Sequence, residues 1–297
     1  MTTERIPEAN SFQAEVPHVL WAAPDGTVFV STITDGGRRS IVHRRDKTGL
    51  WEVIARRRSA EAAQLWGRTA TDLYIMDGDS IAHYDGTKTV EITPFGPTLL
   101  GIGGIGEDVF VAGEEFSGTT GDLSPSSGQI RRRHGVAGSW ASEPTIAGLR
   151  VNEVWTGGGT VWGRAKAPDD QDGSNDRLLQ RGANGRWSEK KFYGAKRPSE
   201  VAVRSVWVSP TGEGFVATDE SVFRSSNGAT SWSNTGEVAG VGALWGRSNN
   251  DVYANTAGGL MHYDGKSWSP TSYARQTMGP VGGTSTVVLL AVTLDQE

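Results

Sequence analysis

The sequence contains no cysteine and no long apolar segment. Without cysteine, disulfide bonds and zinc–thiolate sites are excluded, and the composition fits a reducing compartment. The only long apolar run, residues 287–292, is far shorter than the roughly 20 residues of a membrane-spanning helix and indicates a buried strand. The first 16 residues are polar and lack the apolar stretch of a secretory signal. We therefore expect a cytoplasmic protein that does not insert into membranes.

An excess of positive charge is missing too. Lysine and arginine number 29 against 34 aspartate and glutamate residues, which gives a formal net charge of −5. Nucleic-acid binders usually carry a basic excess on one face, so we expect no nucleic acid as a partner. The sequence also has no glycine-rich phosphate loop followed by a helix and no serine or cysteine nucleophile motif. We expect no cofactor, and the sequence favours a protein that is not an enzyme.

Glycine and tryptophan are plentiful, with 40 and 11 residues. Many short strands joined by glycine-rich turns is the structure that this composition predicts. A 22-residue segment that begins at Leu65 is repeated from Leu244, and ten of the 22 positions are identical. The offset of 179 residues corresponds to four units of about 45 residues, the length of a β-propeller blade.

Aromatic spacing locates the units. In four units a tryptophan on the expected inner strand is followed eight residues later by an aromatic residue on the expected second strand. In the other two units a different residue stands in place of the tryptophan. These aromatic markers are Phe29, Tyr74, Phe110, Trp155, Phe215 and Tyr253. Each unit ends with a short apolar strand, a turn that contains glycine or aspartate, and then a tryptophan. In the second and sixth units the segment is His-Tyr-Asp-Gly, whose Asp-Gly predicts a two-residue hairpin turn. The starts of the outer strands are Trp51, Thr89-Val90, Trp140, Trp187, Trp232 and Trp268.

A seventh unit is incomplete. Residues 278–293 supply two strands, and Ser11–Val16 could supply the missing outer strands, which would join both ends of the chain in one blade and remove open sheet edges. We predict an all-β chain with a single β-propeller domain, 1–297, of seven four-stranded blades, with six blades as the alternative. The expected blades are 18–54, 62–92, 98–142, 145–190, 201–235, 240–270, and 271–297 together with 1–17.

A family resemblance supports this fold. The segment Ser225–Trp232 resembles the Asp-box of BNR-type propellers, Ser-x-Asp-x-Gly-x-Thr-Trp, with Asn227 in place of the aspartate and Ser231 in place of the threonine. The Leu-Trp-Gly-Arg units resemble the WG…DVY…HYDG repeats of bacterial β-propeller proteins. The resemblance implies the fold but leaves the function open, since such propellers serve as glycosidases, lectins, assembly factors and interaction platforms.

Several residues could belong to a small-molecule site. Histidines recur at one place in three units, but we expect strand residues there and no metal site, because different blades separate them. These histidines are His43, His83 and His262. Residues 170–176 alternate oxygen-bearing side chains, yet they lack the glycine and distal glutamate of a helix-loop-helix calcium site.

Two alternatives to protein binding stay open. A carbohydrate-binding propeller could stack sugars on Trp162, which lies outside the repeat pattern, or on Phe116 and Tyr193. A sialidase-like glycoside hydrolase is suggested by Arg5-Ile6-Pro7, which resembles the start of sialidases, where the arginine grips a sugar carboxylate. Tyr273 has the position of the sialidase nucleophile, but no glutamate partner is identifiable.

The main hypothesis places function where the units depart from the repeat. The largest insertions lie between second and third strands, at residues 114–128 and 164–177, with a shorter one at 34–40. We expect these insertions and the blade connections to emerge on one face. Loops on a rigid scaffold commonly carry binding, so we predict a non-catalytic scaffold that binds a partner protein there, as a subunit of a larger assembly. The candidate binding residues are Arg38, Arg39, Arg56, Arg57, Arg58, Phe116, Trp162, Asp169, Asp170, Asp172, Lys190, Lys191 and Tyr193.

Overall fold

The computed structural model describes residue 6 and residues 16–34, 39–58, 63–94, 98–117, 124–167, 176–192, 202–226, 231–272, 278–284 and 288–292. All regular secondary-structure elements in this part of the chain are β-strands, which confirms the all-β prediction. No helix that could cross a membrane occurs among these residues. The chain divides into two compact units: unit 1, Met1–Pro94 with Gln276–Glu297, and unit 2, Phe95–Arg275.

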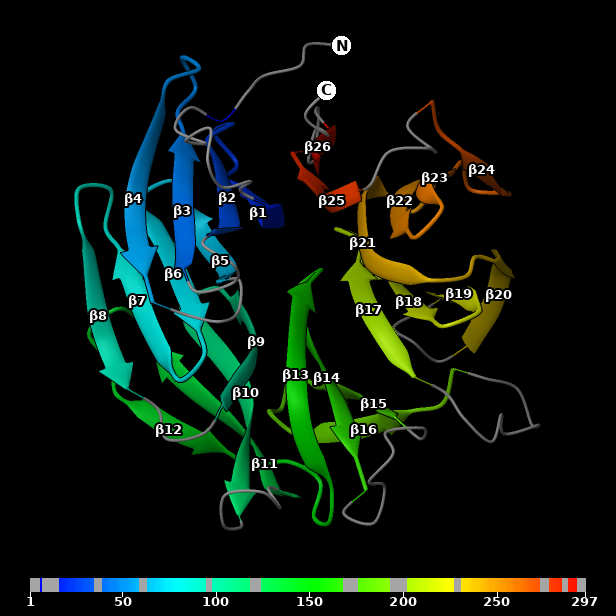
Figure 1. Ribbon diagram of the computed structural model, residues 1–297. Coiled ribbons are helices and arrows are strands. Elements are labelled where there is room, and N and C mark those ends of the chain that lie inside the picture. Colours follow the sequence, from blue (N-terminus) through cyan, green and yellow to red (C-terminus); the bar gives the residue numbers. More distant parts are fainter. Residues whose placement is uncertain are drawn as a thin grey trace. The chain divides into compact units, whose positions relative to one another are not determined.

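Unit 1 contains two four-stranded antiparallel sheets and one two-stranded sheet, each with its strands in chain order (Figure 1). The first sheet comprises β1 (Val16–Ala22), β2 (Val28–Thr34), β3 (Arg39–Arg45) and β4 (Trp51–Arg57). The second comprises β5 (Gln64–Thr69), β6 (Asp72–Asp77), β7 (Ser80–Tyr84) and β8 (Thr89–Pro94). The two-stranded sheet comprises β25 (Met278–Gly283) and β26 (Val288–Val292).

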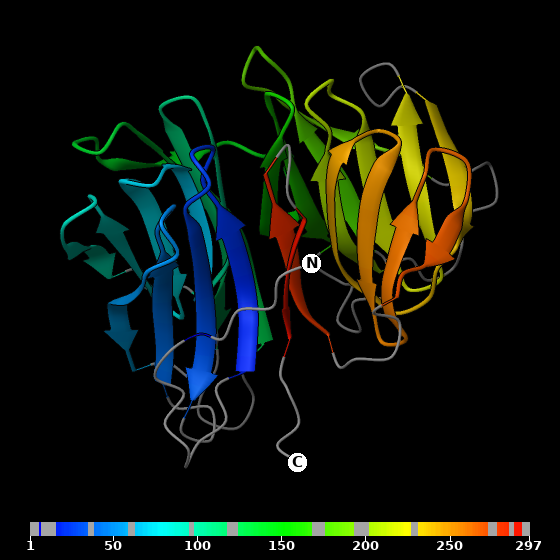
Figure 2. The ribbon, with the colours of Figure 1, turned by 90° about the horizontal axis from the view of Figure 1, so that it is seen from above.

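Unit 2 contains four further sheets of the same kind, and Figure 2 shows its yellow and orange sheets side by side. The third and fourth sheets comprise β9 (Thr98–Ile105), β10 (Asp108–Ser117), β11 (Ser124–His134) and β12 (Trp140–Glu143), then β13 (Arg150–Gly157), β14 (Thr160–Lys166), β15 (Arg177–Arg181) and β16 (Trp187–Lys190). The fifth and sixth comprise β17 (Val203–Val208), β18 (Gly214–Thr218), β19 (Ser221–Ser226) and β20 (Ser231–Glu237), then β21 (Val241–Ser248), β22 (Asp251–Thr256), β23 (Gly259–Tyr263) and β24 (Trp268–Pro270).

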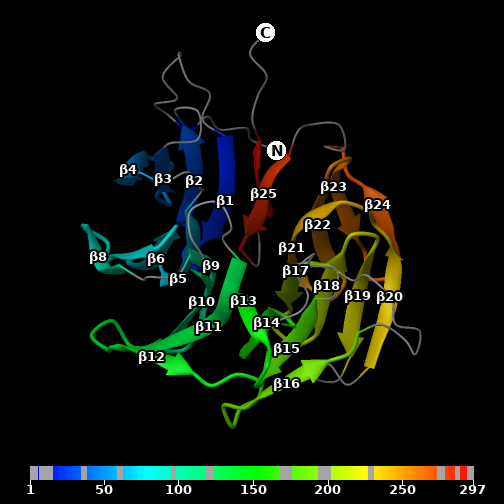
Figure 3. The same cartoon turned by 60° about the horizontal axis from the view of Figure 1, so that its bottom comes forward.

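Six four-stranded sheets correspond to six blades, which is the alternative to the seven predicted. The expected seventh blade has two strands in the described part of the chain, and Ser11–Glu15 lie outside it. β25 packs against β1, as Figure 3 shows. The approach is close at Gly282, where a Cβ atom would lie 2.6 Å from Cδ2 of Leu20. A side chain at this position would require the side chain of Leu20 to move, so glycine favours the close approach of the two strands.

Cross-strand aromatic pairs explain the eight-residue spacing. Trp21 lies opposite Phe29 on the neighbouring strand, with ring centroids 5.6 Å apart. Trp66 and Tyr74 form the same pair at 5.9 Å. Aromatic pairs of this kind stabilise antiparallel strands beyond the area they bury. The repeated tryptophans on the inner strands are thus part of the fold.

The fourth blade differs from its prediction. Trp155 lies on the inner strand β13, opposite Trp162 on β14, so Trp162 is the second-strand aromatic of this blade. The interval here is seven residues because Gly158 and Gly159, with φ of 54° and 73°, form a two-residue turn. In the second blade an irregularity after Gly67 adds one residue. The eight-residue rule therefore misplaced Trp155.

The Asp-Gly turns are longer than the two-residue turns predicted. Tyr84 pairs with Thr89, so the turn contains four residues. Oδ1 of Asp85 accepts hydrogen bonds from the hydroxyl and the backbone N–H of Thr87 and from the backbone N–H of Lys88, at 2.7, 2.9 and 3.0 Å. These bonds lower the pKa of Asp85 to about 2. The side chain of the aspartate, together with Gly86 at a φ of 95°, holds the turn.

The repeated histidines are bound within their own blades. Nε2 of His83 lies 2.8 Å from Oδ1 of Asp72, and the ring packs on Tyr74. His262 makes the same contact with Asp251 at 2.8 Å. The structure thus shows internal partners for the residues that recur, and no group of three or more His, Asp or Glu that could hold a metal ion occurs among the described residues.

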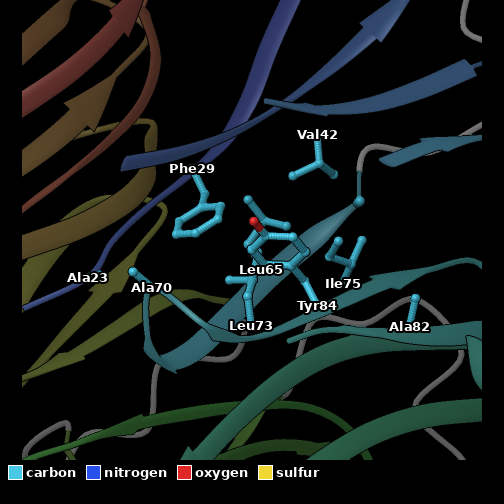
Figure 4. Packing of buried hydrophobic residues seen from close by; sticks show 10 residues of the cluster. Ala23, Phe29, Val42, Leu65, Ala70, Leu73, Ile75, Ala82 and Tyr84 are labelled. Atoms are coloured by element: carbon cyan, nitrogen blue, oxygen red, sulfur yellow. The ribbon is translucent and has the colours of Figure 1, made fainter. Parts of the chain in front are cut away.

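The core lies between adjacent blades. In unit 1, Phe29 and Val42 from the first blade meet Leu73 and Ile75 from the second, with Tyr84 beside them (Figure 4). The alternation of apolar and polar residues along each strand places these side chains on the faces that neighbouring blades share. Both blades are therefore needed to bury either one.

Candidate functional site

The candidate site lies at the strand ends where the second-to-third loops and the blade connections emerge. In the third blade, the predicted insertion 114–128 largely continues the strands, because β10 and β11 remain paired as far as Ser117 and Ser124. Residues 118–123 at its tip lie outside the described residues. The insertion is therefore a lengthened hairpin rather than a loop throughout.

A buried polar network links three blades of unit 2 near these strand ends. Nδ2 of Asn152 on β13 donates a 2.9 Å hydrogen bond to Oε1 of Glu114 on β10. Nε of Arg164 on β14 donates to Oδ1 of Asn152 at 3.3 Å, and its Nη1 donates to the carbonyl of Val203 at 3.1 Å. Glu114 and Asn152 are buried. The bonds run from the third blade through the fourth to the fifth.

Two carboxylates complete the network. Oε2 of Glu153 lies 2.9 Å from Nη2 of Arg164. Oδ2 of the buried Asp176 accepts a 2.7 Å hydrogen bond from the backbone N–H of Val203. Both backbone polar groups of Val203 are thus held by charged side chains, and hydrogen bonds to charged groups are stronger than neutral ones. This places a firm attachment at the start of β17.

The network sits at the bases of the segments that interrupt the repeat. Glu114 precedes the 118–123 tip, Arg164 and Asp176 flank residues 168–175, and Val203 follows residues 193–201. The backbone at the base of 168–175 is held further, because Nη2 of Arg150 donates to the carbonyl of Ala167 at 3.2 Å. One cluster of polar and charged groups therefore holds described residues that border two insertions and one blade connection.

Glu153 has an altered acidity. Burial raises the pKa of its carboxyl to about 7, against the opposing charge of Arg164 and with the assistance of the Asp176 charge. Only 23% of its side chain is exposed. A carboxyl that titrates near neutral pH beside a specific arginine marks a candidate functional position.

A second feature lies in unit 1. A hollow of about 260 Å³ opens between β4 of the first blade and the β6–β7 turn and β8 of the second, and its lining residues are Arg56, Arg57, Arg58, Asp77, Gly78, Asp79, Ser80 and Glu91. The first blade contributes the basic wall, and the second contributes the acidic one. The exposed residues on these walls are Arg56, Arg58, Asp79 and Glu91.

Arg57 belongs to the floor of this hollow. Its Nε lies 2.5 Å from Oδ2 of Asp77, and its Nη2 lies 3.4 Å from Oε2 of Glu91 and also contacts Oγ of Ser80. Its side chain is 15% exposed and that of Asp77 is 5% exposed. Arg57 therefore ties the first blade to the second, while the two flanking arginines face outward.

The other predicted site residues fall into three groups. Arg39 is exposed at the start of β3, next to Ser40, which pairs with Arg57, so it lies at the same sheet end as the hollow. In unit 2, Lys190 is partly exposed and Lys191 is exposed. Phe116 lies on β10 opposite Pro125. The predicted binding residues outside the described part of the chain are Arg38, Asp169, Asp170, Asp172 and Tyr193, and the same holds for Arg5 and Tyr273.

Trp162 does not offer a binding surface. It is 0% exposed, its Nε1 donates to Oγ1 of Thr160 at 3.0 Å, and its ring contacts Trp232 edge-on at 6.0 Å. Its assignment as a candidate ligand-stacking residue is corrected, because a ring with no exposed surface cannot meet a sugar. The large ring instead fills the core between the fourth and fifth blades.

Sequence reasoning missed the network itself. Asn152 and Glu153 lie side by side in an inner strand, and Glu153 is the only acidic residue on the six inner strands β1, β5, β9, β13, β17 and β21. That exception was a usable signal. Their partners could not be named from it, because Glu114, Arg164 and Val203 lie on three other strands.

The comparisons with known proteins concern the fold. A family model described as DUF6242 beta propeller domain matches residues 170–296. No curated protein matches the sequence. YCF48 from Cyanidioschyzon merolae superposes with a TM-score of 0.64 at 12% identity, covering 98% of this chain and 96% of that one. A chain of the Mitotic Checkpoint Complex gives 0.61 at 13% identity, covering 98% and 95%.

A further match involves a longer chain. The extracellular domain of a hybrid two-component system from B. thetaiotaomicron gives a TM-score of 0.60 at 12% identity, covering 90% of this chain and 35% of that one. This chain therefore spans about a third of the length of that domain. At these identities the likeness concerns architecture alone. The chain has a β-propeller fold.

Proposed function

We propose that this chain is a non-catalytic propeller scaffold that binds a partner protein through the strand ends described above. The observation that carries the proposal is the buried network of Glu114, Asn152, Arg164 and Asp176. It fixes the bases of segments that the repeat does not require. Binding segments held on a rigid scaffold lose less entropy when a partner binds, which favours recognition.

The hollow in unit 1 supports the same function. Its basic and acidic walls can recognise a partner surface that presents both charges in the opposite order, and such complementarity fixes the register of an interface. Arg57 supplies a fixed floor, so that Arg56 and Arg58 can make contacts without losing the blade connection. A chain of similar fold is part of the Mitotic Checkpoint Complex, an assembly by its name.

The carbohydrate-binding alternative has less support. It relied on Trp162, whose ring is buried, together with Phe116 and Tyr193. For the glycoside hydrolase alternative, Arg5 and Tyr273 lie outside the described residues. Protein binding therefore has the most support from the described residues.

Co-purification tests the proposal. The tagged full chain is expected to retain a specific protein partner from its native cell extract. Removal of residues 118–123 and 168–175 should abolish its retention, and Arg56→Glu with Arg58→Glu should weaken it at least tenfold. Arg186→Glu, in an exposed turn at the other end of its sheet, is the matched control and should bind normally. Undiminished retention by the deletion and charge-reversal variants, each folded, contradicts the proposal.

A further inference from the structure

The network in unit 2 holds more negative than positive charge around its central arginine. Arg164 faces Glu153 directly at 2.9 Å, and the charge of Asp176 also acts on Glu153. With both carboxyls ionised, these three groups carry a net charge of −1. With Glu153 protonated they are neutral. The charge of a buried cluster strongly affects its stability, because few water molecules screen it.

The surrounding charged groups do not remove this imbalance. β9 packs on Glu153 through Gly101, whose Cβ atom would lie 3.1 Å from Cγ of Glu153, and β9 has no titratable residue. Glu114 on β10 and Arg150 on β13 carry opposite charges and respectively accept from and donate to neutral groups, the amide of Asn152 and the carbonyl of Ala167. On β17 Arg204 lies 2.5 Å from Asp219 and also interacts with the charge of Asp176, but its side chain is half exposed, so water screens its charge.

We infer that Glu153 is a pH-responsive element whose protonation tightens the hold of Arg164 and Asp176 on Val203. When Glu153 is ionised, it competes with Asp176 for the positive charge of Arg164 and repels Asp176. When it is protonated, Asp176 is matched by Arg164, and both hydrogen bonds to the Val203 backbone are favoured. The two bonds, at 2.7 and 3.1 Å, are the geometric basis of the inference.

The change falls in a useful range of pH. Burial raises the pKa of Glu153 to about 7, so the carboxyl gains or loses its proton close to neutrality. Asp176 and Val203 flank segments 168–175 and 193–201. The contact between Asp176 and Val203 at the borders of these segments is therefore firmer below pH 7 than above it. As regulation of partner binding, this step rests on the proposed function; as a change in local stability, it does not.

Amide hydrogen exchange on the full chain tests the inference without any partner. The opening constant measured at the Val203 amide, corrected for intrinsic exchange, should be about tenfold larger at pH 8 than at pH 6 in the natural protein. Glu153→Gln keeps the shape and removes the titration, so its ratio should be close to one. Glu220→Gln, at an exposed glutamate in the β18–β19 turn, is the matched control and should keep the tenfold ratio.

Equal ratios in the natural protein and Glu153→Gln overturn the inference. If Glu153→Gln does not fold, the carboxyl carbon signal of Glu153 in the natural protein provides a second measurement by NMR. A midpoint below pH 5.5 overturns the inference, and a midpoint near 7 accompanied by a shift of the Val203 amide supports it. A tenfold ratio together with pH-independent partner binding would leave the element in place and refute its role in the proposed function.

Discussion

Replacing Arg57 by leucine should show whether this arginine is a binding residue or part of the fold. The change removes the 2.5 Å ion pair with Asp77, whose side chain is 5% exposed. Loss of one partner from a buried ion pair costs about 3–5 kcal/mol because the remaining charge stays buried. Oγ of Ser80 still donates to Asp77 at 2.9 Å, which places the expected loss near the lower limit, about 3 kcal/mol.

Equilibrium unfolding in urea measures this loss, and a double-mutant cycle assigns it. Asp77→Asn combined with Arg57→Leu removes the stranded charge, so the double variant should recover more than 1 kcal/mol relative to Arg57→Leu. An exposed pair is worth less than about 1 kcal/mol. If Arg57→Leu lowers the free energy of unfolding by less than that, and the double variant recovers none of it, Arg57 does not stabilise the contact between the first two blades.

Three further outcomes are expected. Trp162→Ala should lower the free energy of unfolding by about 3–5 kcal/mol, since the whole ring is buried, and thermal or urea unfolding measures it. The pKa of Glu153 is raised from 4.5 to about 7 on folding, so its contribution to stability is complete below about pH 4.5 and is lost as pH rises through 7, a total of about 3 kcal/mol. Urea unfolding at pH 5 and pH 8 should show this decrease in the free energy of unfolding of the natural protein but not of Glu153→Gln. An equal change between the two pH values in both proteins would contradict the prediction. Asp72→Ala should lower stability by about 2–3 kcal/mol, because it leaves Arg68 and His83 without their shared acceptor, whereas exposed Asp79→Ala should have little effect.

The repeated features of the fold were predictable because their causes are local. Trp21 and Phe29 are close in sequence and meet across one turn, so their spacing is visible in the chain. The same holds for Asp85, whose turn contacts are within three residues. The number of blades was not predictable in this way. Residues 278–293 contain strand patterns, but a pattern does not show how many strands join one sheet.

Irregularities of the backbone limited the finer assignments. A one-residue irregularity after Gly67 and its absence beside Gly158 change the interval between paired aromatics from eight to seven. Neither is evident from the side chains, because both are properties of strand pairing. Trp162 therefore seemed to lie outside the repeat, although it occupies the same place as Tyr74. A tryptophan that looked exceptional was a misplaced member of the pattern.

The candidate network was less predictable because its contacts are distant in sequence. Asn152 is 38 residues from Glu114, and Arg164 is 39 residues from Val203. These separations approximate one blade, and each contact joins the second strand of one blade, β10 or β14, to the inner strand of the next, β13 or β17. Residues that break the pattern at the same level of successive blades can therefore meet, even when their sequence contexts are unrelated. Searching the aligned units for polar residues at one level would have suggested the network.

The difference between the repeated charged residues and this network indicates where binding can evolve. Both carboxylate oxygens of Asp72 are occupied within its blade, Oδ1 by His83 and Oδ2 by Arg68. Substitution of such a residue therefore destabilises its own blade. In the network, Arg164 and Asp176 act between blades and hold the ends of segments that the sheets do not need. Changes in those segments alter the surface while the hydrogen bonds to Val203 keep the sheet ends in place, which is how one propeller can acquire a new partner without a new fold.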